Sequence, residues 1–379
     1  MARAYLDHAS TSPARPEVVE AMLPWLSSAD PARVHTEGRM ARAAVEDARD
    51  KVAALLGART REVVFTSSGT EAVNAAVWGA EERASEVSTT GAPPVMVAAA
   101  VEHSSVRDAS ARAGTVHVLA VDGLGRIDLD DLDATLERGS VALVHCQWGN
   151  HEVATLQPVA DAVARCRRAG VLVHVDACQA AGHVPVDFVA IDADLLSVSA
   201  HKLGGPQGVG ALLVRRGLRL ASLLVGGDQE RARRAGAENV AAIVGFGTAA
   251  ATLQDGALDT EAAASRRQTE RVLAAARAVD GVQAYGDVDM RLPHLVCLGI
   301  DGVEAEAVLL GLDQAGIAAH SGSACSSESL VPSPVLEAMG VDADRSLRLS
   351  VGWSTTDADI DAFVESFAPV VDRLRALAG

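Results

Sequence analysis

The chain has 379 residues, 49% of them hydrophobic, which is enough for a large buried core and more than one compact domain usually takes. Its formal net charge of -17 argues against a nucleic-acid binder, because such proteins need clustered Lys and Arg to displace the counterions of the phosphate backbone. The N-terminus lacks a secretory signal, and no stretch has the roughly 18 consecutive apolar residues of a membrane span. We therefore expect a two-domain cytoplasmic protein that binds neither nucleic acid nor membrane.

Apolar, β-branched runs alternate with Ala-rich amphipathic segments between residues 45 and 255, which is typical of strands joined by crossover helices. The pattern predicts an α/β fold with a mainly parallel, seven-stranded sheet. The candidate strands are 62–66, 95–99, 116–120, 141–147, 172–176, 195–198 and 210–214. Because ligands bind beyond the carboxyl ends of the strands in such sheets, we expect the loops there to converge on one site.

The first candidate strand leads through a small, hydroxyl-rich turn into a helix, with the sequence Thr66-Ser67-Ser68-Gly69-Thr70-Glu71. Free N–H groups and the positive end of the helix dipole would bind a phosphate there, with Gly69 allowing close approach and Thr70 offering a hydroxyl. An ordinary helix N-cap has the same appearance, so this segment alone leaves both interpretations open.

Two later strand ends carry a carboxylate and a lysine. Asp176, in the segment 174–179, ends a buried strand and is either a helix cap or the acid that keeps a pyridine nitrogen protonated. Lys202 follows the next strand, one crossover later, so both loops can face one ligand. Lys202 lies between an apolar strand and Leu203-Gly204-Gly205-Pro206, which is an unusual position for a solvated lysine. A buried lysine can form a Schiff base. The pair predicts pyridoxal 5′-phosphate (PLP) bound to Lys202.

The remaining chain predicts a smaller second domain. Residues 256–285 indicate a long exposed helix that connects domains, followed by a strand at 295–299 and helices at 304–314 and from 356 onward. We expect a large domain at 15–255 and a small α+β domain made of 1–14 and 256–379.

The five cysteines are odd in number and form no CxxC pair, so neither a disulfide framework nor a metal site is expected. Cys146 and Cys297 lie in apolar, strand-like runs and should be core, and Cys166 lies on a helix. Cys178 should pack under the cofactor ring. Cys325 differs, because Ser and Gly flank it in the loop 321–329, whereas inert buried cysteines have apolar surroundings.

Taken in order, these motifs resemble the class V (NifS/IscS-like) cysteine desulfurases over essentially the whole chain. The matching segments are Tyr5-Leu6-Asp7-His8-Ala9, Thr66-Ser67-Ser68-Gly69-Thr70-Glu71, Glu102-His103, Asn150-His151-Glu152, His174-Val175-Asp176, His201-Lys202 and Ser321-Gly322-Ser323-Ala324-Cys325. The resemblance implies an aspartate aminotransferase-like PLP fold and a homodimer. It also implies conversion of L-cysteine to L-alanine, with the sulfur held as a persulfide for an acceptor protein.

The resemblance assigns roles by position. Lys202 would hold the cofactor as a Schiff base, Asp176 would pair with the pyridine nitrogen, and His103 would stack on the ring and transfer protons. Cys325 would be the nucleophile, and Arg348 would bind the substrate α-carboxylate. The remaining ligands would be Asn150 and Gln179 for the ring substituents and substrate, and Gly69, Thr70, Ser199 and His201 for the phosphate.

Three segments depart from the family pattern. Residues 234–239 read Arg-Ala-Gly-Ala-Glu-Asn where the family commonly has Ser-Gly-Thr after the arginine, so Ala237 removes a hydroxyl that relatives present to the neighbouring subunit's phosphate. Ala29-Asp30-Pro31 stands where the family has a Gly-Asn-Pro stretch. The segment after Arg348 has the sequence Val351-Gly352-Trp353, where an arginine or another polar residue is common in the family. These changes indicate a divergent member with an altered substrate pocket.

Other functions remain open at this point. The chain could be another class V enzyme, such as a cysteine or selenocysteine lyase or an aminotransferase, or a non-enzymatic scaffold for sulfur transfer. A nucleotide-binding sheet is disfavoured, since no GxGxxG or Walker A sequence follows a strand. The sulfur acceptor could be an iron–sulfur cluster scaffold, a tRNA-modifying enzyme, a sulfur carrier or a natural-product pathway protein.

Overall fold

A seven-stranded sheet forms the centre of the computed structural model, which describes residues 3–87, 92–321 and 332–378. Its strand order is β2-β8-β7-β6-β5-β3-β4, and β3 to β7 pair in parallel. β8 runs antiparallel to both β7 and β2. The bounds are β2 Val63–Thr66, β3 Val95–Ala99, β4 Thr115–Leu119, β5 Val141–Gln147, β6 Leu172–Asp176, β7 Leu195–Ser199 and β8 Gly210–Val214. The predicted mainly parallel α/β fold is confirmed.

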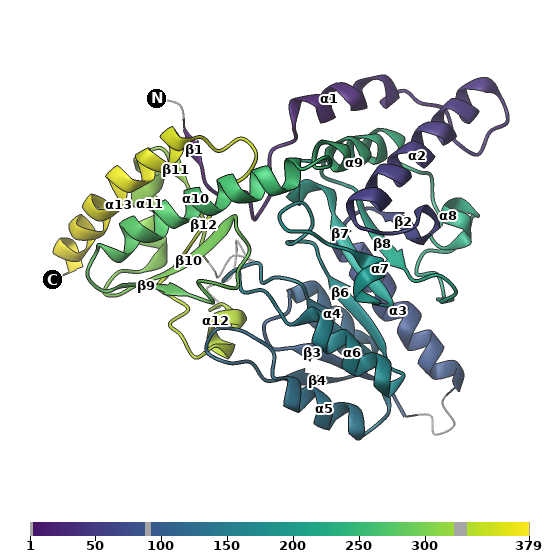
Figure 1. Ribbon diagram of the computed structural model, residues 1–379, viewed down its shortest axis with the longest axis horizontal. Helices are drawn as coiled ribbons and strands as arrows, with labels where there is room; N and C mark the ends of the chain where they lie inside the picture. Colours follow the sequence, from purple (N-terminus) through teal and green to yellow (C-terminus); the bar gives the residue numbers. More distant parts are fainter. Residues whose placement is uncertain (1–2, 88–91, 322–331, 379) are drawn as a thin grey trace.

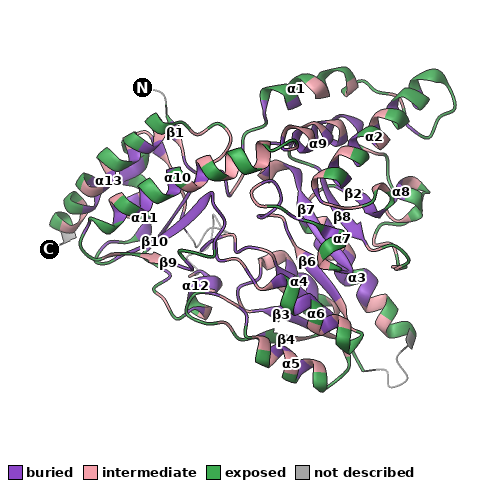
Figure 2. Ribbon diagram, viewed as in Figure 1, coloured by how far each residue is buried: buried purple, intermediate pink, exposed green. Residues whose placement is uncertain are grey.

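Helices cover both faces of this sheet, so its strands are buried on both sides (Figures 1 and 2). One face packs on α3 and α4 through residues such as Val64 and Leu212. The opposite face carries Phe65 and Val198 in the cluster that includes the buried residues of α2, α6 and α9. These helices are α1 Pro16–Met22, α2 Thr36–Leu55, α3 Gly69–Val87, α4 Ser104–Ala113, α5 Leu129–Glu137, α6 Val159–Ala169, α7 Phe188–Ile191, α8 Gln229–Ala232 and α9 Val240–Thr252.

A second group of elements lies beside the sheet, at the left of Figure 1. It contains an antiparallel sheet of order β12-β10-β9 and the parallel pair β1-β11. Leu6, Leu298 and Phe363 are among the residues that form its separate apolar cluster. The elements are β1 Ala4–Tyr5, α10 Ala257–Arg277, β9 Val282–Tyr285, β10 Leu295–Ile300, α11 Ala305–Gln314, β11 Ile317–Ala318, α12 Pro334–Ala338, β12 Ser346–Ser350 and α13 Asp357–Ala378.

The long helix expected at 256–285 is shorter than predicted. α10 ends at Arg277, Gly281 takes a left-handed φ of 69°, and residues 282–285 form β9 against β10. The Asp280-Gly281 turn reverses the chain, because Gly adopts positive φ without steric cost. The prediction of helix through 285 is therefore wrong for its last residues.

The N-terminal segment joins the two groups of elements. β1 pairs with β11, and the chain then runs to the large sheet, where Ser12 N–H donates to His201 O and Arg15 N–H donates to Gly204 O. The carboxyl ends of β5 and β6 lie in register, with Gln147 opposite Asp176. The backbone contacts of Ser12 and Arg15 therefore place the N-terminal segment near the carboxyl ends of the strands of the large sheet. None of the helices in the described part of the chain is long and apolar enough to cross a membrane.

Candidate active site

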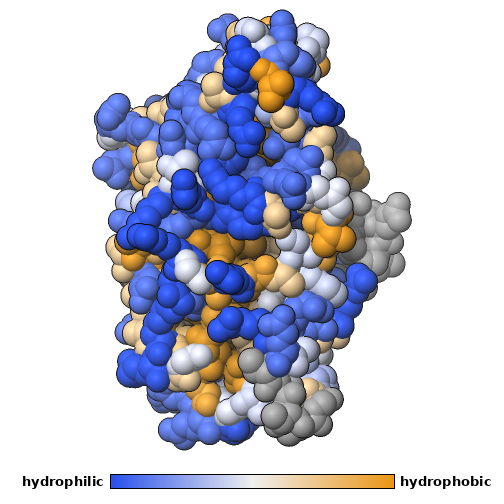
Figure 3. All heavy atoms as spheres, turned by 90° about the vertical axis from the view of Figure 1, so that its right-hand side faces the viewer, coloured by the Kyte–Doolittle hydropathy of each residue, from blue (hydrophilic) through white to orange (hydrophobic). Residues whose placement is uncertain are grey.

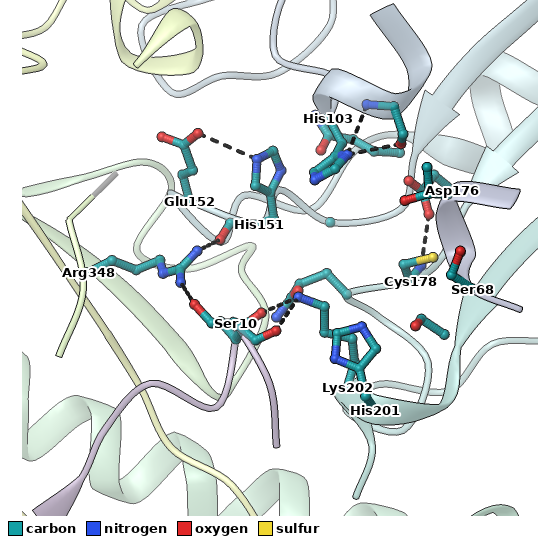
Figure 4. A pocket seen from close by; sticks show the side chains of 18 residues that line it. Ser10, Ser68, His103, His151, Glu152, Asp176, Cys178, His201, Lys202 and Arg348 are labelled. Atoms are coloured by element: carbon teal, nitrogen blue, oxygen red, sulfur yellow. Dashed lines mark hydrogen bonds and ion pairs between the residues drawn. The ribbon is translucent and has the colours of Figure 1, made fainter. Parts of the chain in front are cut away.

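A cavity of about 310 Å³ lies beyond the carboxyl ends of β5, β6 and β7 (Figure 4). It receives side chains from both groups of elements, since Arg348 comes from β12 and Lys202 from the turn after β7. The predicted site residues that line it are Gly69, Thr70, His103, Asp176, Gln179, Ser199, His201, Lys202 and Arg348. The loops at the strand ends thus converge as expected.

Lys202 is a buried amine in a single 3-10 turn, Ala200–Lys202, directly after β7. Its Nζ donates to the backbone oxygens of Ala9 and of Ser10, the latter at 3.0 Å. Burial, followed by the positive charge of Arg348, lowers the pKa of Lys202 to about 8. About a tenth of the lysine is therefore a neutral, nucleophilic amine at pH 7, far more than for a solvated lysine.

Asp176 ends β6 as a buried carboxylate. Its Oδ1 accepts hydrogen bonds from Cys178 N and Ser197 Oγ, both at 2.9 Å. Burial alone would raise the pKa of Asp176, but the nearby His174 ring and the Cys178 N–H lower it by more, and the result lies below the usual value. The site therefore holds a negative charge that can pair with a cationic ring nitrogen.

The turn before α3 is shaped for close approach of a ligand. A Cβ on Gly69 would meet Cys178 Sγ at 2.5 Å, so only glycine fits there. Thr70 lies in the first turn of α3, where free N–H groups point outward. Across from this helix end, the buried Ser199 Oγ has no hydrogen-bond partner among the described residues. A buried hydroxyl without a partner costs free energy, so this cradle suits an anionic group that would accept from Ser199.

His201 and Gln179 are held by contacts outside the cavity. His201 Nδ1 bonds Thr11 Oγ1 at 2.8 Å, and burial with the nearby Lys202 lowers the pKa of His201 to about 4, so the ring is neutral. Gln179 Nε2 contacts His294 Nε2 at 3.0 Å, which orients the amide.

His103 is the N-cap of α4. Its Nδ1 accepts from Ser105 N at 3.1 Å and bonds Ser105 Oγ at 2.9 Å. Because Nδ1 is the acceptor, the neutral ring carries its proton on Nε2. The helix end thus fixes both the position and the tautomer of an imidazole that can transfer protons.

Arg348 lies in β12 with its guanidinium in the cavity. Its Nη2 donates to Asp7 Oδ1 at 3.0 Å and to Ser10 Oγ at 2.5 Å, and its Nη1 donates to His151 O at 3.1 Å. Arg348 Nε is buried without a partner among the described residues. This arginine is the cationic group suited to a substrate carboxylate.

Asn150 and Cys325 stand apart from this set. Asn150 is fully buried, its Oδ1 accepts from Glu152 N and Val153 N at 2.8 Å, and its Nδ2 donates to Val101 O. These contacts hold the turn after β5, and the side chain does not line the cavity. A ligand contact for Asn150 stays a prediction. Cys325 lies outside the described residues.

Sequence reasoning missed several cavity residues, namely Ser10, Gln147, His151 and Glu152. Ser10 directly follows the motif at 5–9, and His151 and Glu152 belong to the motif at 150–152, so both segments carried a signal. Their side chains were not singled out because their approach to the cavity depends on tertiary packing.

The cysteines expected to be structural are buried. Cys146, Cys166 and Cys297 are at most 1% exposed. Burial, with a smaller effect of Asp176, raises the pKa of Cys178 well above its usual value, which disfavours a reactive thiolate beside the cavity.

Comparisons with known proteins show which family the chain resembles. The model of the aminotransferase class-V family matches residues 4–363. A cysteine desulfurase of Trichormus azollae is 42% identical, with 98% of this chain and 94% of that protein covered. The cysteine desulfurase NifS of Azotobacter vinelandii is 40% identical, with 99% and 94% covered. The X-ray structure of a NifS-like protein from Rickettsia africae superposes with a TM-score of 0.88 at 29% identity and covers 98% of this chain and 99% of its own.

Proposed function

The chain belongs to the aminotransferase class-V family, and from this premise we propose that it is a cysteine desulfurase that converts L-cysteine to L-alanine. The relatives named cysteine desulfurase align over nearly the whole chain. The observation that carries the proposal is the cavity in which the Lys202 amine, the Asp176 carboxylate and the Arg348 guanidinium lie together. Such a site suits an amino acid held by its carboxylate next to a carbonyl-type cofactor.

The described residues fit PLP as that cofactor. Ser199 Oγ, Gly69 and Thr70 at the start of α3, and the neutral His201 ring would hold its phosphate. Asp176 would pair with the ring nitrogen, and Lys202 Nζ would hold the cofactor covalently. When bound, PLP supplies an electron sink for the Cα–H and C–S bonds of the substrate.

The chain's own residues bind the substrate and move protons. Arg348 would exchange Asp7 or Ser10 for the substrate carboxylate. Lys202, with a pKa of about 8, can release and take up a proton at Nζ near neutral pH. The Nδ1 contacts of His103 leave its Nε2–H for hydrogen bonding and proton transfer. These groups would serve the substrate's Cα and Cβ positions.

Cys325 would be the sulfur acceptor within the chain, by its place in the motif at 321–325. Its sulfur forms a bond to the substrate sulfur as the substrate C–S bond breaks, and the electron pair of that bond stays on carbon. One proton leaves the attacking thiol and one joins carbon, so L-alanine and a persulfide form without an external oxidant. The persulfide then passes to an acceptor protein.

The test compares Cys325→Ala and Lys202→Ala with the wild-type protein, using alanine release from L-cysteine and the visible absorbance of added PLP. We expect Cys325→Ala to bind PLP normally and to lose turnover with L-cysteine by at least about 100-fold, because the nucleophile is gone. Lys202→Ala should lack the Schiff-base absorbance. Undiminished turnover in Cys325→Ala would contradict the persulfide route and favour a lyase. A colourless wild-type protein would favour a scaffold.

The same family membership leads us to propose a homodimer. An apolar hollow of about 280 Å³ opens on the face seen in Figure 3, lined by residues of α3, β8 and the segment 218–224. Arg234 lies at this hollow and forms an ion pair with Glu71 of α3 at 2.8 Å. A second copy seated there would bring residues 234–239 toward its partner's phosphate cradle, as in the relatives that the sequence resembles.

We also propose the domain division, the cellular location and the type of partner of the protein. The division into a large domain, 15–255, and a small domain, 1–14 with 256–379, is supported by the separate apolar cluster that combines Leu6 with residues such as Leu298 and Phe363. Leu295 and the α12 residues Val335 and Leu336 instead pack in the cluster of the large sheet, so the two parts share an interface there. A cytoplasmic location and a protein acceptor without nucleic acid or membrane fit the net charge of -17. Transfer of labelled sulfur from cysteine to candidate acceptors would identify the partner.

A further inference from the structure

His151 and Glu152 form an acid–imidazole pair at the cavity that no role above uses. His151 Nε2 lies 3.4 Å from Glu152 Oε1, and both side chains line the cavity with 15% and 6% exposure (Figure 4). The turn that carries them is rigid, because Asn150 Oδ1 accepts the backbone N–H groups of Glu152 and Val153. The imidazole is therefore presented to the cavity from a fixed backbone.

Glu152 is held from its other side as well. Its Oε2 accepts a hydrogen bond from Ser333 Oγ at 2.5 Å, and Ser333 is the N-cap of α12. One carboxylate oxygen thus faces the imidazole and the other is fixed by a different element. A buried carboxylate bonded in this way orients an imidazole and stabilises the imidazolium that forms when the ring takes a proton.

His151 also lies beside both the substrate position and the first proton-transfer residue. Its backbone oxygen accepts from Arg348 Nη1, so a substrate whose carboxylate binds Arg348 would lie next to His151. Its ring packs edge-on against His103, with 5.1 Å between the ring centroids. The titratable groups near it are the carboxyl groups of Glu102 and Glu152 and the guanidinium of Arg348. Two imidazoles thus border one reacting centre.

Desulfuration needs two proton transfers at that centre. The attacking thiol loses a proton as the sulfur–sulfur bond forms, and the carbon that keeps the C–S electron pair gains one. We propose that His151, oriented by Glu152, is a second catalytic residue that accepts the proton released when the sulfur–sulfur bond forms, while Lys202 Nζ, which has taken up the Cα proton, returns a proton to carbon. Protons are conserved over the two transfers, and no other reactant is needed. This inference rests on the proposed desulfurase activity.

The test uses the full-length, PLP-loaded protein and measures alanine formation from L-cysteine in the presence of dithiothreitol. We expect His151→Ala to lower kcat by about 100-fold, since general acid–base residues contribute roughly 10²- to 10⁴-fold, with KM changed by less than about 3-fold. Added imidazole should enter the space left by the side chain and restore kcat by at least about 10-fold, in a saturable manner. His151→Gln, which keeps a polar side chain, should be equally slow. Glu152→Gln should lose about 10-fold in kcat.

The control is His117→Ala, a histidine on β4 at the far edge of the sheet, which should keep wild-type kcat and show no response to imidazole. Cofactor absorbance should be unchanged in every variant, which separates proton transfer from PLP binding. A kcat within about 3-fold of wild type in His151→Gln would overturn the proposal, as would loss in a folded His151→Ala that imidazole does not restore. If the wild-type protein itself released no alanine, the proposed function would fail instead.

Discussion

Glu102 is a buried acid directly behind the site. Its Oε1 accepts the Gln147 N–H at 2.8 Å, and its Oε2 has no partner among the described residues. Burial, reinforced by the negative charge of Asp176, raises the pKa of Glu102 to about 8. Two neighbouring carboxyl groups are thus kept in different states at neutral pH, with Asp176 ionised and Glu102 protonated. The cofactor's ring nitrogen would then meet a single negative charge.

We predict that Glu102 makes stability fall as pH rises. The pKa of Glu102 is higher in the folded state than its usual value of 4.5, so the folded chain binds more protons than the unfolded chain between about pH 4.5 and 8. Stability therefore decreases in that window by up to about 1.4 kcal/mol per pH unit. Glu102→Gln, which mimics the protonated acid, should remove this slope. Urea unfolding of the cofactor-free protein at pH 5 to 8 measures it, and equal slopes in both proteins would contradict the assignment.

Single residues differ in how far the sequence reveals them. Asp176 and Lys202 follow apolar strands, where parallel-sheet geometry alone predicts a shared site. Ser10 and His151 reach the cavity only because β1 pairs with β11 and because Asn150 folds the turn after β5. Both causes are tertiary, and no local pattern encodes them.

At the scale of elements, α8 has an unusual backbone. Glu230, Arg231 and Ala232 have φ values of 48°, 59° and 60°, a left-handed run that costs free energy in residues other than glycine. The Glu230 carboxylate accepts Arg49 Nη1 at 2.6 Å, Arg49 Nη2 at 2.8 Å and Phe65 N at 3.0 Å. This buried pair ties α8 to α2 and β2 and thereby holds the segment that contains Arg234.

We predict that Arg49→Met destabilises the protein by about 3 to 5 kcal/mol, because it leaves the buried Glu230 carboxylate without its cation. The double variant Arg49→Met with Glu230→Met should cost less than the sum of the single changes, since neither charge is then left alone. Urea unfolding of the four proteins gives the coupling energy. Additive effects would mean that the two side chains stabilise the fold independently.

Elements with continuous apolar runs were predictable within a residue. β3, β5, β6 and β8 have the expected bounds because strands covered on both faces appear as short runs rich in Val, Leu and Ala. β9 was missed, since four half-buried residues after an Asp-Gly turn have no distinctive period. α8 was missed because nothing in Gln-Glu-Arg-Ala signals left-handed backbone, and its partner Arg49 lies far away along the chain.

At the scale of the whole molecule, the homodimer proposal makes Ala237 informative. Ala237 is exposed within one chain, so a larger side chain is tolerated there. If residues 234–239 approach the partner's phosphate, Ala237→Thr adds a hydroxyl to that contact.

We predict that Ala237→Thr tightens PLP binding by about 5- to 10-fold, the value of roughly one ordinary hydrogen bond. Titration of the cofactor-free protein with PLP measures this, and light scattering should give about twice the chain mass of 39.0 kDa. Ala237→Ser is the smaller matched change and should show part of the gain. A monomer that binds PLP as tightly as before would contradict the shared site.

The bonds from Lys202 Nζ to the carbonyl oxygens of Ala9 and Ser10 also set an order of events during synthesis. The segment that carries these carbonyls leaves the ribosome before the other site residues, but its strand β1 has to wait for β11 at residues 317–318, and Arg348 follows later still. The large sheet can form earlier, whereas the cavity is complete only when residues up to Arg348 have been made. A newly made chain therefore acquires its finished site as one of its last folding steps.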